Sequence, residues 1–276
     1  MNAKGFFTRI FGAMDRALFP KDITCDCCGG ELVADTRYRL CSKCMDKLPF
    51  VDGHICLSCG APIKDESDYC LRCQKLDSVF ERSRAPLVYD GEAKALVYKF
   101  KFNGKKYIAE TLGALMADCF LKNEMKADVI VFVPMTKQEE RRRGFNQSEL
   151  LAQEVGKRLN IPVLPALEKI KDTSMQKELG REDREKNLSG AFKCVFDEIK
   201  RLDVLLIDDI FTTGITANEC SKALLKGKVK SVSVLTATVA VLKPIGEEKE
   251  ETKKELKKEK KRLKNKKEIT IDLLDE

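Results

Sequence analysis

The sequence predicts an α/β protein with a parallel sheet flanked by helices, preceded by a small cysteine-rich module. Fully apolar runs of strand length alternate with segments of helical periodicity, as expected for strands that are buried on both faces and joined by helices. Eight of the 12 cysteines fall in four Cys-x-x-Cys pairs near the start of the chain. The 276 residues and 43% hydrophobic content are enough for one good-sized α/β domain and a small module.

Residues 1–24 are predicted to form an amphipathic helix. Charged residues interrupt its apolar positions, so the segment lacks the continuous apolar core of a signal peptide. We expect the helix to dock on the protein, and weak binding at a membrane surface is the alternative. We expect no membrane span, because no apolar run approaches the required length. The apolar positions at helical spacing are Phe6, Phe7, Ile10, Phe11, Met14, Ala17 and Leu18.

Residues 25–78 are predicted to form a double zinc ribbon. Two residues between thiolates let one tight turn present both sulfurs to a tetrahedral ion, so four pairs predict two closed structural Zn²⁺ sites. Sequential pairing makes two ribbons and interleaved pairing makes a cross-brace; the short segments between neighbouring pairs favour the sequential order. Such pairs favour metal over disulfides, and therefore a reducing, cytoplasmic location. The predicted ligands are Cys25, Cys28, Cys41, Cys44, Cys56, Cys59, Cys70 and Cys73.

Residues 79–246 are predicted to form the α/β domain. Strands separated by helices indicate parallel pairing with right-handed crossovers. The expected strands lie near 86–90 and at 129–133, 163–164, 204–207 and 231–240, and the expected helices cover 93–100, 108–120 and 146–159. Residues 247–276 form a charged Lys/Glu tail, disordered or partly helical, that either solubilises the protein or adds non-specific nucleic-acid affinity.

The most informative run of the chain joins a buried strand to a predicted helix. Two carboxylates follow the apolar residues 204–207, and a loop of hydroxyl residues and glycine follows the carboxylates. The carboxylates can accept hydrogen bonds from vicinal hydroxyls or help hold a divalent cation, and a helix N-terminus favours phosphate. A ligand with ribose hydroxyls and a phosphate fits both halves; a solvated Asp pair before a Thr-rich cap is the alternative. The candidate residues are Asp208, Asp209, Thr212, Thr213, Gly214 and Thr216.

Two further polar segments could contact phosphates. Arg141, Arg142 and Arg143 stand at a predicted helix entry, where guanidinium groups could clamp the phosphates of a nucleic acid; a solvated basic turn is the alternative. Residues 169–192 are long, polar and poor in apolar anchors, as in a lid over an active site, with a surface loop as the alternative. The candidate lid and phosphate contacts are Gln176, Arg181 and Arg184.

The run from 204 to 216 resembles the phosphoribosyl-pyrophosphate motif of type I phosphoribosyltransferases. The resemblance implies that Asp208 and Asp209 hold the ribose hydroxyls and that the loop after them binds the 5-phosphate. It also implies Mg²⁺ as a cofactor that accompanies phosphoribosyl pyrophosphate. The turn after the strand at 129–133 falls at the same edge of the sheet, where that family has its pyrophosphate loop. Here that loop would be Met135, Thr136 and Lys137.

Motifs up to Val241 resemble the ComF family (ComFC/GntX-like), in which a double zinc ribbon precedes a phosphoribosyltransferase-like domain. They include 89–91, 133–134, 142–147, 176–187 and 208–216, besides the cysteine pairs. The resemblance implies binding of phosphoribosyl pyrophosphate and a role in the uptake or processing of single-stranded DNA during natural transformation. Single-stranded DNA and a competence helicase or other DNA-processing protein are then the expected partners.

Two classes of function fit this pattern. An active phosphoribosyltransferase would transfer phosphoribosyl to a nitrogen base, as in nucleotide salvage, mainly by positioning and charge stabilisation. The sequence favours such an enzyme but identifies neither the acceptor base nor catalytic residues. A non-catalytic adaptor would instead sense phosphoribosyl pyrophosphate in the same pocket, while the zinc ribbons and basic residues hold DNA or a partner.

Overall fold

A computed structural model describes residues 24–32, 36–171 and 188–241 of the chain. The chain divides into two compact units, residues 1–240 and 241–276, and every helix and strand described below belongs to the first unit. None of the helices in the described ranges combines the length and apolar character of a bilayer-spanning segment. The predicted N-terminal helix, the lid contacts at Gln176, Arg181 and Arg184, and the charged tail lie outside the described residues.

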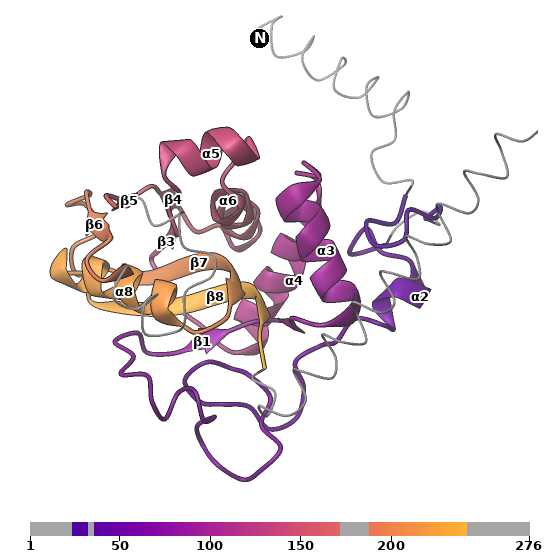
Figure 1. Ribbon diagram of the computed structural model, residues 1–276, viewed down its shortest axis with the longest axis horizontal. Coiled ribbons are helices and arrows are strands. Elements are labelled where there is room, and N and C mark those ends of the chain that lie inside the picture. The colour runs from indigo at the N-terminus through magenta and orange to yellow at the C-terminus, as the bar shows by residue number, and fades with distance from the viewer. Residues whose placement is uncertain (1–23, 33–35, 172–187, 242–276) are drawn as a thin grey trace, which may run out of the picture. The chain divides into compact units, whose positions relative to one another are not determined.

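A parallel sheet of six strands organises the α/β domain (Figure 1). Its order is β1-β8-β7-β3-β4, and β2 also pairs with β8. The two longest strands are β7 and β8, and they pair in parallel from Asp203 opposite Ser231 to Phe211 opposite Val239. Pro86 separates β1 from β2 along this edge, which is where a residue without a backbone N–H is tolerated. The strands are β1 (Ser83–Arg84), β2 (Leu87–Val88), β3 (Val129–Phe132), β4 (Val163–Leu164), β7 (Asp203–Phe211) and β8 (Ser231–Val239).

Helices cover both faces of the sheet. On one face Ile130 and Leu205 pack in a single apolar cluster with α3 (Gly91–Phe102), α4 (Ile108–Lys122) and α6 (Gln147–Leu159). The alternate residues, such as Val131 and Leu206, pack on the other face with α8 (Ile215–Lys226). Because strand side chains alternate between faces, continuous apolar strands are required for such a two-sided core.

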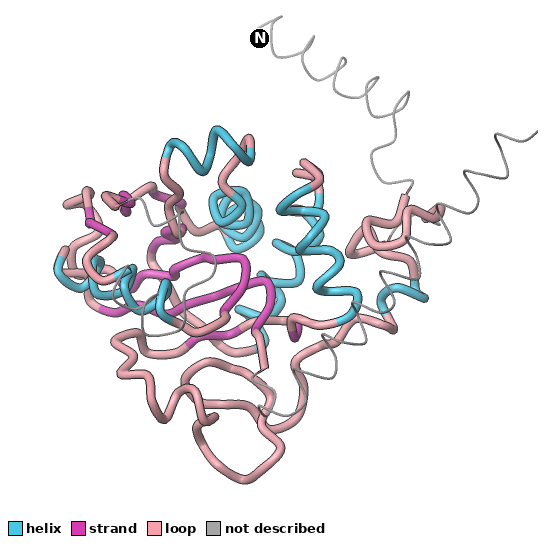
Figure 2. Tube along the Cα trace, in the orientation of Figure 1, coloured by secondary structure: helices cyan, strands magenta, loops and turns pink. Residues whose placement is uncertain are grey.

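The cysteine module consists mostly of turns and loops, with the short helix α2 (Ser42–Met45) in its first half (Figure 2). Isolated bridges join Thr24 to Glu31 and Ile55 to Pro62, one in each half. The cysteines of the first half, except the exposed Cys28, belong to the apolar cluster of α3, α4 and α6, whereas those of the second half belong to the α8 cluster. The two halves of the module therefore pack against opposite faces of the sheet.

The predicted fold class is confirmed as a parallel α/β sheet flanked by helices and preceded by two four-cysteine clusters. The helices expected at 93–100, 108–120 and 146–159 occur within two residues of their expected ends. Three details differ. β7 continues through the Asp pair to Phe211, because β8 pairs with it along its whole length. Helix α5 (Lys137–Arg143) was not predicted, and neither was the antiparallel pair β5 (Leu167–Lys169) and β6 (Phe192–Cys194), which holds together the two ends of the predicted lid segment.

Candidate functional site

The Asp pair lies where β7 outlasts its neighbour. β3 pairs with β7 only as far as Ile207, so Asp208 and Asp209 extend past the end of β3 while β8 continues to support them. Asp208 Oδ1 accepts hydrogen bonds from the Asp209 backbone N–H at 2.8 Å and from the Ser148 hydroxyl at 3.0 Å. The pair is therefore held in place at the carboxyl end of the sheet, which is where open α/β sheets bind ligands.

Burial and like charge dominate the electrostatics of this pair. Burial, and after it the charge of Asp209, raises the pKa of Asp208 to about 7. Asp209 Oδ2 forms an ion pair with Lys101 Nζ at 2.8 Å, and both side chains are more than four-fifths buried. A bound cation or a set of hydroxyl donors would favour the ionised form of Asp208.

Lys101 and Ser148 were missed by sequence reasoning. Lys101 is at the end of α3, and Ser148 is the second residue of α6, so both are far from the Asp pair in the chain. The start of α6 is fixed by Asn146, whose side chain accepts hydrogen bonds from the backbone N–H groups of Ser148 and Glu149. The signal available in the sequence was this N-cap, which places the Ser148 hydroxyl at a helix start.

The loop after β7 leads directly into α8. Gly214 is the N-cap residue with a φ of 82°, and no side-chain hydrogen bond caps the helix from this position. Thr212 is exposed, and Thr213 and Thr216 are half-buried. The Thr213 hydroxyl accepts a long hydrogen bond of 3.4 Å from the Ile215 N–H. The first turn of α8 thus presents backbone donors and hydroxyl groups to a phosphate-sized anion.

The predicted pyrophosphate turn follows β3 and is part of a helix start. Thr136 caps α5 in a reciprocal capping box with Glu139, and Lys137 is the first helical residue. Lys169 Nζ lies 3.1 Å from Glu139 Oε2. Burial alone would raise the pKa of Glu139, but the Thr136 N–H and the Lys169 ammonium outweigh it and lower the pKa. Met135, like Thr136, is half-buried.

The three consecutive arginines do not stand at a helix entry, so that prediction is wrong. They form the last turn of α5, which Gly144 ends in the left-handed conformation before α6 begins. Arg141 and Arg142 are exposed, whereas Arg143 donates to Gln147 Oε1 at 2.9 Å and lies 5.6 Å from the centre of the Phe102 ring. The helix expected at 146–159 does begin just after them, but Gly144 and the N-cap Asn146 separate the arginines from its first turn.

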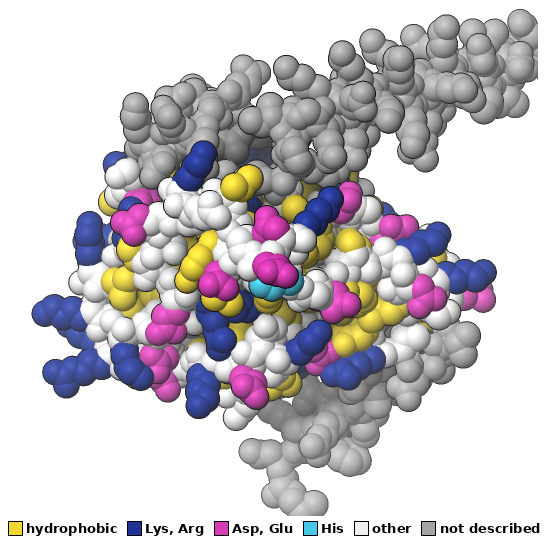
Figure 3. All heavy atoms as spheres, turned by 90° about the horizontal axis from the view of Figure 1, so that it is seen from below, with side chains coloured by type: hydrophobic (Ala, Val, Ile, Leu, Met, Phe, Trp, Pro, Cys, Tyr) yellow, Lys and Arg dark blue, Asp and Glu magenta, His cyan; other side chains and the backbone are white. Residues whose placement is uncertain are grey.

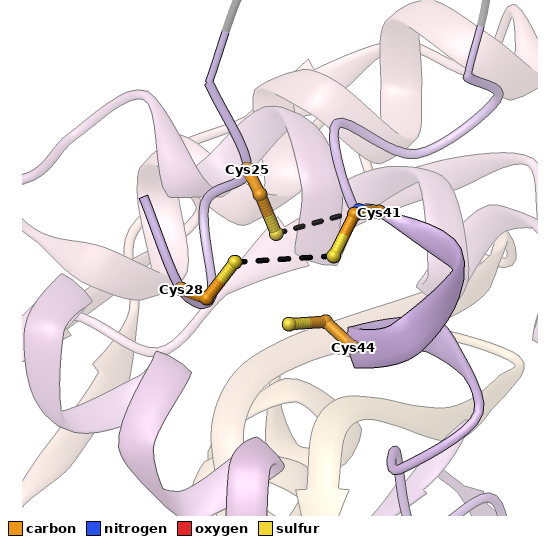
Figure 4. Close-up of side chains that lie close together, drawn as sticks. All are labelled: Cys25, Cys28, Cys41 and Cys44. Carbon is orange, nitrogen blue, oxygen red and sulfur yellow. Dashed lines mark hydrogen bonds between the residues drawn. The ribbon is translucent and has the colours of Figure 1, made fainter. Parts of the chain in front are cut away.

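The eight predicted metal ligands form two clusters in sequential order. Cys25, Cys28, Cys41 and Cys44 form one cluster, and Cys56, Cys59, Cys70 and Cys73 form the other, with the sulfurs of each cluster within 4.8 Å of one another. Figure 4 shows the four side chains of the first cluster converging from two turns of the chain. Sulfur–sulfur distances of 3.8 Å and 3.7 Å match the edge of about 3.8 Å expected for a tetrahedron with Zn–S bonds of 2.3 Å.

In each cluster the pKa of one thiol is lowered while those of its neighbours are raised: burial raises the pKa of Cys44, and hydrogen bonds with Cys56 raise the pKa values of Cys59 and Cys73. Burial would raise the pKa of Cys25, but backbone N–H groups of Cys28, Cys41 and Cys27 outweigh it and lower the pKa to about 7. Hydrogen bonds from Cys59 and Cys73 lower the pKa of Cys56 far below its usual range. Thiolates are the species that bind zinc. The donor sets therefore fit two structural Zn²⁺ sites, and no backbone rearrangement is needed to close them.

Known proteins match up to about three quarters of this chain. The family model for a double zinc ribbon domain matches residues 14–74. Competence protein F of Haemophilus influenzae is 31% identical over 218 residues, which are 76% of this chain and 94% of that protein. Competence protein ComFC of Bacillus subtilis is 29% identical over 236 residues, 78% of this chain and 94% of that protein. DNA utilization protein YhgH of Salmonella typhimurium is 30% identical over 186 residues, 65% of this chain and 82% of that protein.

Among solved structures, glutamine phosphoribosylpyrophosphate amidotransferase from B. subtilis shares 21% identity with this chain at a TM-score of 0.33. The overlap covers 46% of this chain and 25% of the amidotransferase chain.

Proposed function

The chain belongs to the ComF family of competence proteins, and we propose that it binds phosphoribosyl pyrophosphate with Mg²⁺ and acts on single-stranded DNA during natural transformation. Competence protein F and ComFC are named for competence, and YhgH is named for DNA utilization. A cytoplasmic location agrees with the two reduced cysteine clusters.

One observation carries the ligand proposal. An Asp pair lies near the carboxyl end of β7, and its second member, Asp209, is six residues before the start of α8, whose first turn has no side-chain cap at Gly214. Ribose hydroxyls could donate to the carboxylates while the 5-phosphate accepts from the backbone N–H groups of α8. Mg²⁺ prefers oxygen ligands and keeps several waters, so it could bind the pyrophosphate and reach Asp208 or Asp209 through water.

Lys101 adds a cation to this pocket. Its ammonium pairs with Asp209 in the free protein and would lie beside the pyrophosphate of a bound ligand. Before the ligand binds, the ion pair with Lys101 keeps the buried carboxylate of Asp209 paired. When the ligand binds, its hydroxyls become the partners of Asp209 and its pyrophosphate becomes the partner of Lys101.

The DNA half of the proposal rests on an aromatic and cationic surface beside the pocket. Tyr98 and Phe102 lie one helical turn apart on α3, are 57% and 56% exposed, and have ring centres 4.9 Å apart. Arg143 flanks Phe102, and Arg141 and Arg142 are exposed on the same short helix as Arg143. Exposed rings beside guanidinium groups suit bases that stack and phosphates that pair.

Another face of the molecule has mixed charge. Among the described residues, Figure 3 shows acidic and basic side chains interspersed on this face. Electrostatic binding of a polyanion requires clustered cations. We therefore place single-stranded DNA on the surface of Tyr98, Phe102 and the three arginines. Exposed apolar residues of the second ribbon, Leu57 and Leu71, are the proposed contact for a DNA-processing partner.

Phosphoribosyl transfer to a nitrogen base is the second candidate function. Lys101 beside the Asp pair and Lys169 beside the predicted pyrophosphate turn are cations that could stabilise a departing pyrophosphate. Release of pyrophosphate in the presence of nucleobases distinguishes an enzyme from an adaptor. A panel of bases that yields no pyrophosphate, with ligand binding intact, would select the adaptor.

Thermal denaturation with and without phosphoribosyl pyrophosphate and Mg²⁺ tests the binding proposal. A ligand that binds only the folded state raises Tm, so we expect an increase for the wild type and its loss in Asp209→Asn. Asp203→Asn is the matched control, because Asp203 is at the other end of β7 and also pairs with a lysine, Lys230 at 2.7 Å. If Asp209→Asn and Asp203→Asn keep the same ligand-induced increase, the ligand is bound elsewhere.

A further inference from the structure

Arg72 is a fully buried cation in the second cysteine cluster. It lies between the ligands Cys70 and Cys73 and is only 2% exposed. A buried charge is unfavourable unless an opposite charge and hydrogen bonds compensate it. The partners of this guanidinium therefore indicate which parts of the fold Arg72 holds together.

Those partners come from three parts of the fold. One guanidinium nitrogen donates to Cys59 Sγ at 3.0 Å. The second terminal nitrogen donates to the carbonyl oxygen of Ala240 at 3.0 Å and to that of Thr212, the first residue of the loop after β7, while Nε has no hydrogen-bond partner among the described residues. The guanidinium carbon also lies 5.1 Å from the centre of the Phe211 ring. Arg72 thus connects a metal-ligating sulfur to the backbone of the candidate phosphate loop.

The compensating negative charge comes from the cysteine cluster. Zinc held by four thiolates carries a net charge of about −2, and zinc fixes all four sulfurs in the thiolate form. Two carbonyls, one sulfur and one aromatic ring are the contacts of Arg72 on the described part of the chain, and no carboxylate is among them. Without the ion, the four sulfurs are no longer held together, and Cys59 Sγ is not fixed in the position where it accepts from Arg72.

The segment after the second cluster packs against the same loop. A Cβ at Gly214 would come within 2.8 Å of Leu76 Cδ2, so the two are already in close contact. Asn218 of α8 accepts from the Val79 N–H at 2.8 Å and donates to the Asp77 carbonyl at 3.0 Å. The second ribbon and its exit segment therefore support both the loop and the first turn of α8.

The first cluster has a different set of contacts. Lys99 of α3 donates to the Cys27 carbonyl, and Thr111 of α4 donates to Asp26 Oδ2 at 2.6 Å. Both contacts lie on the other face of the sheet from α8. Zinc at the first cluster should therefore leave the loop after β7 unaffected.

We propose that Arg72 is a positioning residue, through which zinc at the second cluster holds the 212–214 loop in the conformation that receives phosphate. The phosphate assignment rests on the proposed function, whereas the link between the cluster and the loop rests only on the contacts of Arg72. Occupancy of this cluster would then set ligand affinity, although no cysteine touches the ligand.

Arg72→Met tests the link, with Arg84→Met as the matched control. Arg84 is a second buried arginine at the junction of ribbon and domain, where it donates to the carbonyls of Ser83 at 2.7 Å and Leu57 at 3.1 Å and to Asn123 Oδ1 at 3.2 Å; none of these hydrogen bonds reaches the loop or a sulfur. We expect Arg72→Met to accelerate amide hydrogen exchange at 212–216 and to weaken binding of phosphoribosyl pyrophosphate with Mg²⁺ by about tenfold or more. Arg84→Met should change neither. Arg72→Lys, which keeps the charge but lacks the fork, should be intermediate.

Cys70→Ser and Cys28→Ser provide a second test if Arg72→Met does not fold. Each removes one ligand from one cluster, and zinc per chain is measured to confirm the loss. Faster exchange at 212–216 in Cys70→Ser alone supports the proposal; equal exchange in both variants overturns it. Unchanged exchange in a folded Arg72→Met also overturns it. A wild type that binds no phosphoribosyl pyrophosphate contradicts the proposed function instead, and the exchange measurement still decides the role of Arg72.

Discussion

Replacing Asp208 by Asn should stabilise the folded protein at neutral and alkaline pH. The side-chain oxygen of Asn can accept the same two hydrogen bonds, from the Asp209 N–H and the Ser148 hydroxyl, so the change removes mainly the buried charge. The pKa of Asp208 is raised from 3.8 to about 7, first by burial and then by Asp209. Between these two pKa values, Asp208 is therefore protonated in the folded state but already ionised in the unfolded chain.

The sign and size follow from this difference. A raised carboxyl pKa costs stability progressively as pH rises from about 4, and the whole cost is present above pH 7. At about 1.4 kcal/mol for each tenfold change in proton concentration, the upper limit is about 4 kcal/mol. We expect a gain of about 2–4 kcal/mol for Asp208→Asn at pH 8 and a gain that shrinks toward pH 5.

Urea unfolding of both proteins between pH 5 and pH 8.5 measures this gain. Taking the difference at each pH removes the contribution of zinc release, which affects both proteins. Asp203→Asn serves as the control at the start of β7, because hydrogen bonds from Lys230 and Ser231 lower the pKa of Asp203, so its loss should slightly destabilise the protein above pH 4. If the difference in unfolding free energy between Asp208→Asn and the wild type does not change with pH, or grows toward acid pH, the assignment of a buried carboxyl with a raised pKa at Asp208 is refuted.

Three further predictions concern the loop, the clusters and the DNA surface. Gly214→Ala should lower the free energy of unfolding by about 2 kcal/mol or more, because Gly214 has a positive φ of 82° and Leu76 lies close to it. Gly104 also has a positive φ, of 65°, but no neighbour within 4 Å, so Gly104→Ala should cost less, and denaturant unfolding compares the two variants. Removal of zinc should unfold the cysteine module, because structural Zn²⁺ contributes about 10–16 kcal/mol to such units. Elemental analysis before chelation should give two zinc ions per chain, matching the two clusters, and calorimetry after chelation should show a lower Tm. Phe102→Ala should weaken binding of single-stranded DNA by about 1–3 kcal/mol in fluorescence anisotropy, and Arg142→Ala should reduce the salt slope by about 0.7, while Leu121→Ala, which removes an equally exposed apolar side chain from α4, should do neither.

The parts of the fold that follow local rules were predictable from the sequence. The apolar run 204–207 indicated a central strand, and β3 and β8 on either side of β7 explain why its residues are buried on both faces. The spacing of the cysteine pairs indicated both clusters and favoured their sequential order, which the positions of the sulfurs confirm. These features depend on neighbours within a few residues of one another.

Features that depend on distant neighbours were not predictable. Lys101 and Asp209 are 108 positions apart in the chain and meet because the C-terminal end of α3 lies next to the Asp pair of β7. Arg72 and Thr212 are 140 positions apart, and no local pattern marks Arg72 as buried. Helix α5 was missed because it is short, has no buried residue and is stabilised by the Thr136–Glu139 capping box and its contact with Lys169.

Calorimetric titration of the zinc-loaded protein with phosphoribosyl pyrophosphate in Mg²⁺ buffer tests most directly whether the Asp pair and the start of α8 form a ligand site. We predict saturable binding at one site per chain, lost in Asp209→Asn and retained in Asp203→Asn. Ribose 5-phosphate should compete for the same site, since it carries both the hydroxyls and the phosphate that the Asp pair and the start of α8 are proposed to recognise. A wild-type protein that gives no binding heat, and no change in stability, at millimolar ligand would contradict the account.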